Sequence, residues 1–148
     1  MFSSTAVESA VRGGYRYAYL EAEGPYSKLA NKQDEVLFEL KKQGIKPGPQ
    51  VTLLLSDPRN TPHDDLRART GFIIAADVTL QAPLMLATIE SRKVLVASIK
   101  AHPLFAYGKT YGALLDYCQD HHMSLILPTF EIMDHSVLSV EMPLETTP

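Results

Sequence analysis

Glu131 is the residue whose type and position are best suited to chemistry. It lies in the segment 129–133, whose apolar and aromatic residues predict a β-strand. Side chains alternate between the two faces of a strand, so Glu131 shares a face with Met133. Phe130 and Ile132 occupy the other face and are expected to pack beneath helices, which turns Glu131 away from them. A carboxylate in an apolar site could bind a cation or a hydrogen-bond donor, and burial would raise its pKa. On an open surface it would be an ordinary solvated side chain.

Three tyrosines could form a wall of such a site. Tyr15, Tyr17 and Tyr19 alternate along an expected strand at residues 15–22, so they share one face. An apolar ring with a polar hydroxyl suits a ligand wall, although half-buried strand tyrosines without such a role are equally common. Two further tyrosines fall on an apolar helical stripe, where core positions are expected: Tyr107 and Tyr111.

The remaining reactive side chains predict neither a metal site nor a nucleophile. His121 and His122 are adjacent, so on a helix they would point about 100° apart and could not share a metal. The other histidines have no partner at ligand spacing, and Cys118, the single cysteine, lies on the apolar stripe. No phosphate-binding glycine loop or nucleophile elbow occurs. We therefore expect no metal, no cofactor and no catalytic residue.

Composition narrows the classes of function. At 148 residues, 45% of them hydrophobic, the chain fits one ordinary globular domain. The net charge of −3 and the lack of clustered Lys and Arg argue against direct nucleic-acid binding. No apolar run has the length of a signal peptide or a membrane span. We expect a soluble protein, and a cytoplasmic location accords with a single cysteine.

The expected elements repeat along the chain. Strands at 15–22 and 93–99 each lead through a proline-containing turn into a helical pattern. An offset of 78 residues carries one helical stripe onto the other. The stripes are Leu29, Gln33, Val36, Leu37 and Leu40 in the first helix, and Tyr107, Tyr111, Leu114, Leu115 and Cys118 in the second.

The same offset extends past both helices. Gly44-Ile45 corresponds to His122-Met123, and the strand expected at 51–55 corresponds to 129–133. A fixed offset predicts a duplicated supersecondary unit. Each unit is expected to close with another strand, at 72–76 and at 137–142.

The units form one domain in this interpretation. A short helix is expected to begin at Pro62 with Thr61 as its N-cap, and another to run from Pro83 to about Ile89. Residues 1–14 are expected to be a mobile N-terminal segment. The domain is expected to span 15–148, with unit one at about 15–78 and unit two at about 93–144.

Short motifs in a fixed order resemble the gyrase-inhibitor-like (GyrI-like) effector-binding domain family. They are the turn Gly24-Pro25-Tyr26, the run Ser56 to Arg67 with its Asp57-Pro58 and Thr61-Pro62, the strand Phe130 to Met133, and the closing Pro143-Leu144. The resemblance covers about residues 15–144. The chain is also similar to the corresponding domain of testis-expressed protein 264, a eukaryotic membrane-anchored receptor.

The resemblance implies an α+β fold in which two strand-helix-strand-strand units form a pseudo-twofold pair around a central cleft. Members of this family act as ligand-sensing domains of transcription regulators, as free-standing proteins, and in one branch as hydrolases of reactive small molecules. Leu55 and Met133 stand where the family often has aromatic residues, which makes the expected cleft more aliphatic. His102 replaces a usual glycine, and the chain lacks the tryptophan associated with the hydrolase branch.

We therefore expect a stand-alone small-molecule binding module whose largely apolar ligand, which could be cationic, lies between the two halves. One alternative is a protein-docking or inhibitor domain, for example of a DNA-topology enzyme. A second is a hydrolase in which Glu131 positions water. The expected ligand-binding residues are Glu131, Met133, Leu55, Leu53, Tyr17 and Tyr19.

Overall fold

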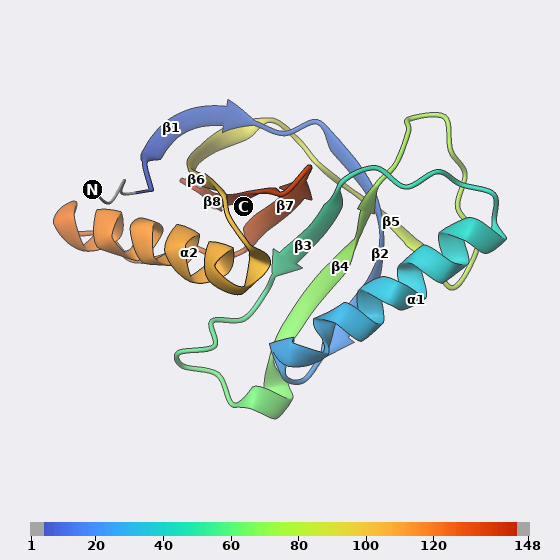
Figure 1. Cartoon of the computed structure of the whole chain (residues 1–148), viewed down its shortest axis with the longest axis horizontal. Coiled ribbons are helices and arrows are strands. Elements are labelled where there is room, and N and C mark those ends of the chain that lie inside the picture. The colour runs from blue at the N-terminus through green and yellow to red at the C-terminus, as the bar shows by residue number, and fades with distance from the viewer. Residues whose placement is uncertain (1–4, 145–148) are drawn as a thin grey trace.

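The computed structural model describes residues 5–144, and it contains one eight-stranded antiparallel sheet and two α-helices (Figure 1). The strand order is β1-β6-β8-β7-β3-β4-β2-β5. The strands are β1 (Val7–Arg12), β2 (Tyr15–Glu23), β3 (Gln50–Leu54), β4 (Arg67–Ile73), β5 (Met85–Ile89), β6 (Arg92–Lys100), β7 (Thr129–Asp134) and β8 (Val137–Pro143). The helices are α1 (Leu29–Lys42) and α2 (Pro103–Asp120), and the short 3-10 helices are η1 (Tyr26–Lys28) and η2 (His63–Asp65).

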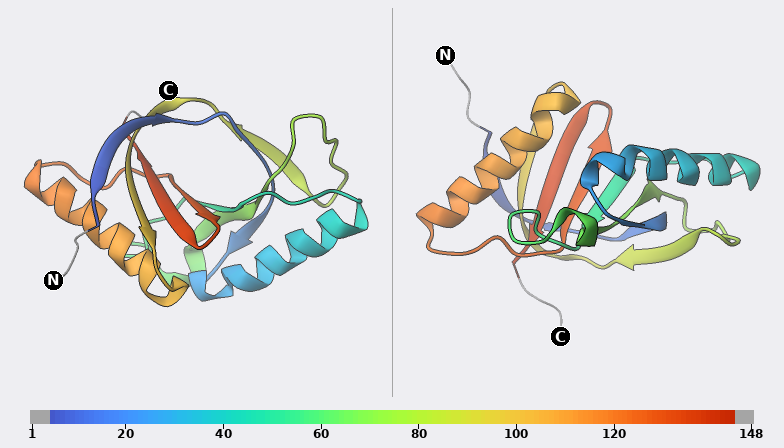
Figure 2. Two further views of the ribbon diagram at one scale, coloured as in Figure 1. Left: turned by 45° about the horizontal axis from the view of Figure 1, so that its top comes forward. Right: turned by 90° about the horizontal axis from the view of Figure 1, so that it is seen from below.

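The sheet curls because the chain connects its two edges directly. The edge strand β1 leads into β2, which lies beside the opposite edge strand β5, and β5 leads back into β6, which lies beside β1. Arg12 at the end of β1 pairs with Arg92 of β6, and Tyr15 at the start of β2 pairs with Ile89 of β5, so both ladders keep the same register. Gly13 lies in the bend between β1 and β2 with φ +153°, where a Cβ atom would come within 2.3 Å of the Glu90 carbonyl oxygen. Only glycine fits this close approach, and the resulting curl is visible in Figure 2.

The curl gives the sheet two apolar faces. Both helices lie on the outer face, where α1 packs on β2 and β4 and α2 packs on β6 and β8. Val36 and Leu40 of α1 and Leu114 and Cys118 of α2 are buried beneath them. The inner face holds what we call the inner core: Tyr17, Tyr19, Val51, Leu53 and Phe130.

The inner core corrects one expectation from the sequence. Phe130 and Ile132 were expected beneath the helices, but both lie on the inner face, where Phe130 is 0% exposed. Glu131 therefore faces the helices and not away from them, because neighbouring strand residues alternate. The prediction was wrong because a curled sheet buries its inner face without any helix to cover it.

Other boundaries also differ from the expectations. Residues 83–89 do not form a helix: Met85–Ile89 is strand β5, which pairs with β2. Val7–Arg12, expected within a mobile segment, is strand β1 paired with β6. Both are sheet-end strands whose mixed exposure leaves no clean alternation in the sequence. The strand expected at 72–76 begins earlier, at Arg67.

The expected strands and helices elsewhere are confirmed, and the fold is a mixed α+β structure. The short helix near Pro62 is the 3-10 helix η2, whose start has no side-chain cap from Thr61. Within the described residues, no helix is both long and apolar enough to cross a membrane.

Candidate functional site

A cavity of about 460 Å³ lies on the outer face between the N-terminal part of α1 and the first two thirds of α2. Strands β3 and β7, which pair at the centre of the sheet, form its floor. The walls are mostly leucine and tyrosine side chains from both helices, with the loop after β3 at one side. The lining residues are Tyr26, Leu29, Gln33, Thr52, Leu54, Ser56, Asp57, Pro58, Arg59, Tyr107, Tyr111, Leu115, Leu125, Leu127 and Glu131.

Glu131 is the buried acid of the floor. It lies opposite Thr52 in the β3–β7 ladder, and its side chain is only 6% exposed. The Tyr111 hydroxyl of α2 donates a hydrogen bond to Oε2 of Glu131 at 2.5 Å. Burial raises the pKa of Glu131 from 4.5 to about 7, and the hydrogen bond from Tyr111 offsets part of that effect. The carboxyl is therefore close to its midpoint at neutral pH.

The negative charge of Glu131 affects the pKa of two nearby tyrosines. Burial, and secondarily the charge of Glu131, raises the pKa of Tyr107 to about 12. The same two causes raise the pKa of Tyr111 further. Both phenols are thus neutral hydroxyl groups throughout the physiological range.

A second buried carboxyl shows by contrast what is unusual about Glu131. Glu141 lies on the inner face and is 2% exposed, yet both of its oxygens are engaged. Arg92 donates to Oε1 at 2.7 Å and Tyr15 donates to Oε2 at 2.6 Å. Among the described residues, Glu131 has only the hydrogen bond to Oε2, so its Oε1 is left to face the cavity.

The α1 side of the floor carries a neutral polar cluster. Gln33 Nε2 lies 3.3 Å from Thr52 Oγ1 and 2.9 Å from Thr70 Oγ1. The two threonine hydroxyls are 2.9 Å apart, and Thr70 Oγ1 also donates to the Val51 carbonyl at 3.2 Å. Gln33 and Thr52 line the cavity beside Glu131, so the polar floor extends across both central strands.

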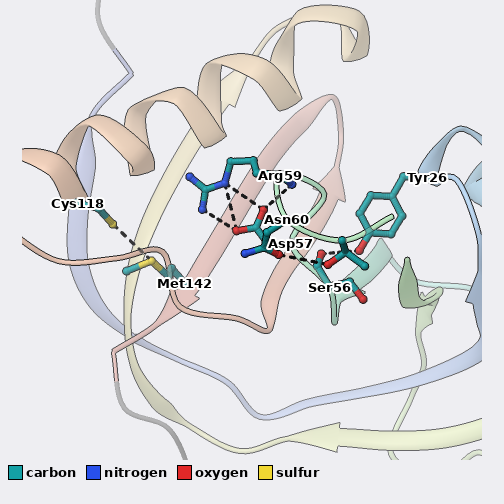
Figure 3. A network of polar contacts seen from close by, with 8 residues as sticks. Tyr26, Ser56, Asp57, Arg59, Asn60, Cys118 and Met142 are labelled. Carbon is teal, nitrogen blue, oxygen red and sulfur yellow. Dashed lines mark hydrogen bonds and ion pairs between the residues drawn. The ribbon is translucent and has the colours of Figure 1, made fainter. Parts of the chain in front are cut away.

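The loop after β3 forms the rim of the cavity. Figure 3 shows the polar contacts that hold this loop. Arg59 donates to Asp57 through Nε at 3.0 Å and through its terminal nitrogen at 2.7 Å, and its backbone N–H also bonds Asp57. These hydrogen bonds from Arg59 lower the pKa of Asp57. The Tyr26 hydroxyl donates to the Ser56 carbonyl at 2.7 Å and so connects η1, which precedes α1, to the same loop. The rim charges thus neutralise each other, which leaves Glu131 as the charge at the base.

The structure brings only part of the sequence-derived set to this cavity. Glu131 lines it, whereas Tyr17, Tyr19 and Leu53 lie in the inner core on the opposite face. Met133 shares the outer face but packs into the core beneath α2.

Leu55 follows the end of β3 and is 38% exposed, while its neighbour Leu54 lines the cavity. The expected residues of β2 and β3 are thus separated from Glu131 by the thickness of the sheet. The alternation of β3 places Thr52 and Leu54, and not Leu53, on the face of Glu131.

Glu131 is the one lining residue that was expected as a site residue, and the residues not anticipated include Gln33, Thr52, Leu54 and Tyr111. Gln33 gave a signal in the sequence, because it is the one polar member of an otherwise apolar helical stripe. Tyr111 occupies the matching position of the second stripe. Across residues 5–144, no three His, Cys, Asp or Glu side chains gather closely enough to hold a metal ion.

Comparison with known proteins finds solved structures with a similar fold. No family model and no curated protein sequence matches the chain. Among solved structures, the C-terminal domain of EcmrR has a TM-score of 0.66 at 12% identity, with coverage of 95% of this chain and 99% of that one. In the EcmrR–DNA complex, the chain spans 58% of the EcmrR chain.

Two further structures share the fold. SAV2435 bound to tetraphenylphosphonium has a TM-score of 0.60 at 12% identity, with coverage of 93% of this chain and 94% of that one. A hydrolase from Listeria innocua has a TM-score of 0.62 at 11% identity, with coverage of 96% and 93%. At these identities the likeness establishes a shared fold, found in proteins with different descriptions.

Proposed function

We propose that this chain is a small-molecule binding module of the GyrI-like type, which holds a largely apolar, cationic ligand in the cavity between α1 and α2. The observation that carries the proposal is Glu131: a carboxyl that is 6% exposed, has one oxygen unbonded within the described residues, and lies at the base of an apolar cavity. An unpaired buried charge destabilises a fold, so a cationic ligand that pairs with it explains why a charge is present.

The comparisons support a ligand of this class. SAV2435, which shares the fold, is bound to tetraphenylphosphonium, an apolar cation. The EcmrR C-terminal domain matches nearly the whole chain. In the present chain, a cation would be attracted by Glu131, while its apolar body would contact side chains such as Leu54 and Leu115.

We further propose that the cavity lies at the junction of a duplicated unit. Outward from the central β3–β7 pair, the strand order is β4 then β2 on one side and β8 then β6 on the other. The helix ends also correspond: Ile45 N–H bonds the Leu40 carbonyl, and Met123 N–H bonds the Cys118 carbonyl. These matches support two copies of one unit related by a pseudo-twofold axis.

Helix and strand positions support slightly different offsets. Gln33 and Tyr111, 78 residues apart, both reach the sheet from matching helical positions. Their partners on the sheet, Thr52 and Glu131, are 79 residues apart and pair with each other. The strands of the two units thus correspond at an offset of 79 residues, one more than the offset of 78 for the helices. At equivalent places, one unit has the pair Gln33 and Thr52, and the other has the pair Tyr111 and Glu131.

Ligand binding by wild type and by Glu131→Gln tests the proposal. The amide keeps the shape of the side chain and removes the charge, and a hydrogen bond to a charged group is typically worth about 1.5–3 kcal/mol. Apolar amines should therefore bind the variant roughly ten- to a hundredfold more weakly. Quaternary ions lose the attraction of the charge but no hydrogen bond, and their binding should weaken in the same direction. Thermal-shift screening followed by isothermal titration calorimetry would measure this.

Asp134→Asn provides the control. Asp134 is an exposed acid on the same strand, so its removal changes the net charge equally without touching the cavity. This control should bind the same cations as wild type does. If no cation of the panel binds, or if Glu131→Gln binds as tightly as wild type, the proposal is wrong and a protein-docking role becomes the better account.

A further inference from the structure

We propose that the cavity selects cations that carry N–H donors, such as protonated amines and amidines, over quaternary ammonium or phosphonium ions of the same apolar size. This inference rests on the proposed function and specifies the ligand class of the same site. The observations that carry it are the directions of the hydrogen bonds along the cavity floor, which leave acceptors facing the ligand.

Thr70 determines which groups donate and which accept in the first set of hydrogen bonds. Its hydroxyl proton is used for the Val51 carbonyl, because a carbonyl can only accept. Thr70 Oγ1 must therefore accept from both of its other partners, Thr52 and Gln33. Thr52 gives its one proton to Thr70, so it too can only accept from Gln33.

Gln33 must then present its NH₂ group to both hydroxyls. The amide orientation follows from the hydrogen-bond network, since neither threonine has a proton left to donate to an amide oxygen. Gln33 uses Nε2 for Thr52 at 3.3 Å and for Thr70 at 2.9 Å. Its Oε1 has no hydrogen bond within the described part of the chain, and the side chain lines the cavity.

Glu131 determines which groups donate and which accept in the second set of hydrogen bonds. An ionised carboxylate can only accept, so the Tyr111 hydroxyl gives its proton to Oε2. The Thr129 hydroxyl, 2.8 Å from Tyr111, then donates to Tyr111. No donor of the described residues reaches Glu131 Oε1, so a second acceptor faces the cavity beside the first.

The two acceptors belong to one patch of the floor. Gln33 lies over Thr52, and Thr52 pairs directly with Glu131 across β3 and β7. A protonated amine carries the charge that Glu131 attracts and two or three N–H donors for these acceptors. A quaternary cation has the charge but no donor, so both acceptors would lose water on binding without gaining a partner.

A matched pair of probes tests the inference on the intact chain: 4-phenylbutylammonium and 4-phenylbutyltrimethylammonium, titrated calorimetrically at pH 8. The primary amine stays protonated there, as a lysine side chain does. Because a buried acceptor left unpaired is costly, we expect the primary amine to bind roughly tenfold or more tightly. Gln33→Leu removes one of the two acceptors and should therefore reduce that preference.

Gln119→Leu is the matched control for the helix substitution, because Gln119 is an exposed glutamine on α2 outside the cavity. It should retain the full preference for the amine. Equal or tighter binding of the trimethyl probe by wild type overturns the inference and leaves the proposed function standing. Failure of both probes to bind contradicts the proposed function as well. The wild-type comparison decides the question even if Gln33→Leu does not fold.

Discussion

The buried carboxylate of Glu131 lowers the stability of the folded protein when it is ionised, and it also provides an acceptor for a cationic ligand. The unfolded chain titrates this group near 4.5, whereas the folded protein holds its proton up to about pH 7. The groups that face it are the hydroxyls of Tyr111, Tyr107 and Tyr26, and the nearest rim charges, Asp57 and Arg59, are paired with each other. Glu131 is thus the titrating group of the cavity near neutral pH, and its titration can be predicted with a definite sign.

Glu131→Gln should be more stable than wild type at high pH and equal to it at low pH. The folded state binds more protons than the unfolded state between about pH 4.5 and 7, so the stability of wild type falls across this window. At about 1.4 kcal/mol per pKa unit, the full difference above pH 7 is at most about 3.5 kcal/mol. Urea unfolding at pH 4, 6 and 8 measures it. A difference that does not change with pH would contradict a buried, unpaired Glu131.

Cation binding should also release protons. A cation beside Glu131 favours the ionised form, so it lowers the pKa of this carboxyl from about 7. At pH 6, where most of the free protein is protonated, binding should release a substantial fraction of one proton, and at pH 8 almost none. Calorimetry in buffers of different ionisation enthalpy gives this number. Equal proton release at both pH values would show that the cation does not contact Glu131.

The sequence singled out Glu131 as a candidate, but it did not indicate which residues surround this side chain. Its strand and its place in a family motif identified it as a candidate. The direction of its side chain could not be deduced, because β7 carries apolar residues on both faces: Met133 shares the face of Glu131, and Phe130 and Ile132 lie on the other. The inner core formed by Phe130 and Tyr17 depends on the curl of the whole sheet, so Tyr17, Tyr19 and Leu53 were assigned to the wrong side of it.

At the scale of elements, the two helices end in the same way with different residues. Gly44 after α1 has φ +72°, and His122 after α2 has φ +54°. Both adopt the left-handed conformation that closes a helix through a bond from the next residue, and glycine is the residue that adopts it without strain. The second helix therefore carries a strained end.

His122→Gly should stabilise the protein by about 0.5–1 kcal/mol, because it removes the steric cost of a left-handed side chain. Gly44→Ala is the reciprocal change and should destabilise by about 1 kcal/mol, although no atom lies within 4 Å of the added Cβ. Chemical denaturation measures both. If the two substitutions shift stability in the same direction, the two helix ends are not equivalent.

The long elements were predictable, and the short sheet-end strands were not. The stripes of α1 and α2 and the apolar strands β3, β6 and β7 follow the periods of helix and strand. β5 follows Pro83 and was interpreted as part of a helix, because proline is common at the first position of a helix. Its pairing with β2 is a tertiary effect that local sequence does not encode.

At the scale of the whole molecule, the curled sheet depends on close approach between strands. Gly71 lies in β4 opposite Tyr19 of β2, and a Cβ atom there would come within 1.8 Å of the Ala18 carbonyl oxygen. Backbone is the obstacle, so no side-chain rotation can relieve the contact. The fit between β2 and β4 holds the α1 half of the cavity floor in place.

Gly71→Ala should destabilise the protein by about 1–3 kcal/mol, as overpacking in a core usually does, and should weaken ligand binding by displacing β4. Gly108→Ala is the control: Gly108 lies in α2 with nothing within 4 Å of an added Cβ, so alanine should stabilise by up to about 1 kcal/mol. Unfolding of the purified variants gives both values. A neutral Gly71→Ala would show that β2 and β4 do not approach as closely as described.

A crystal structure of the protein with 4-phenylbutylammonium would show whether the cavity between α1 and α2 holds a cationic small molecule. We expect ligand density over β3 and β7, with the ligand nitrogen within hydrogen-bonding distance of Glu131 Oε1 and the phenyl group against leucines such as Leu54 and Leu115. Density on the inner face beside Tyr17, or an empty cavity when the ligand is bound elsewhere, would contradict it.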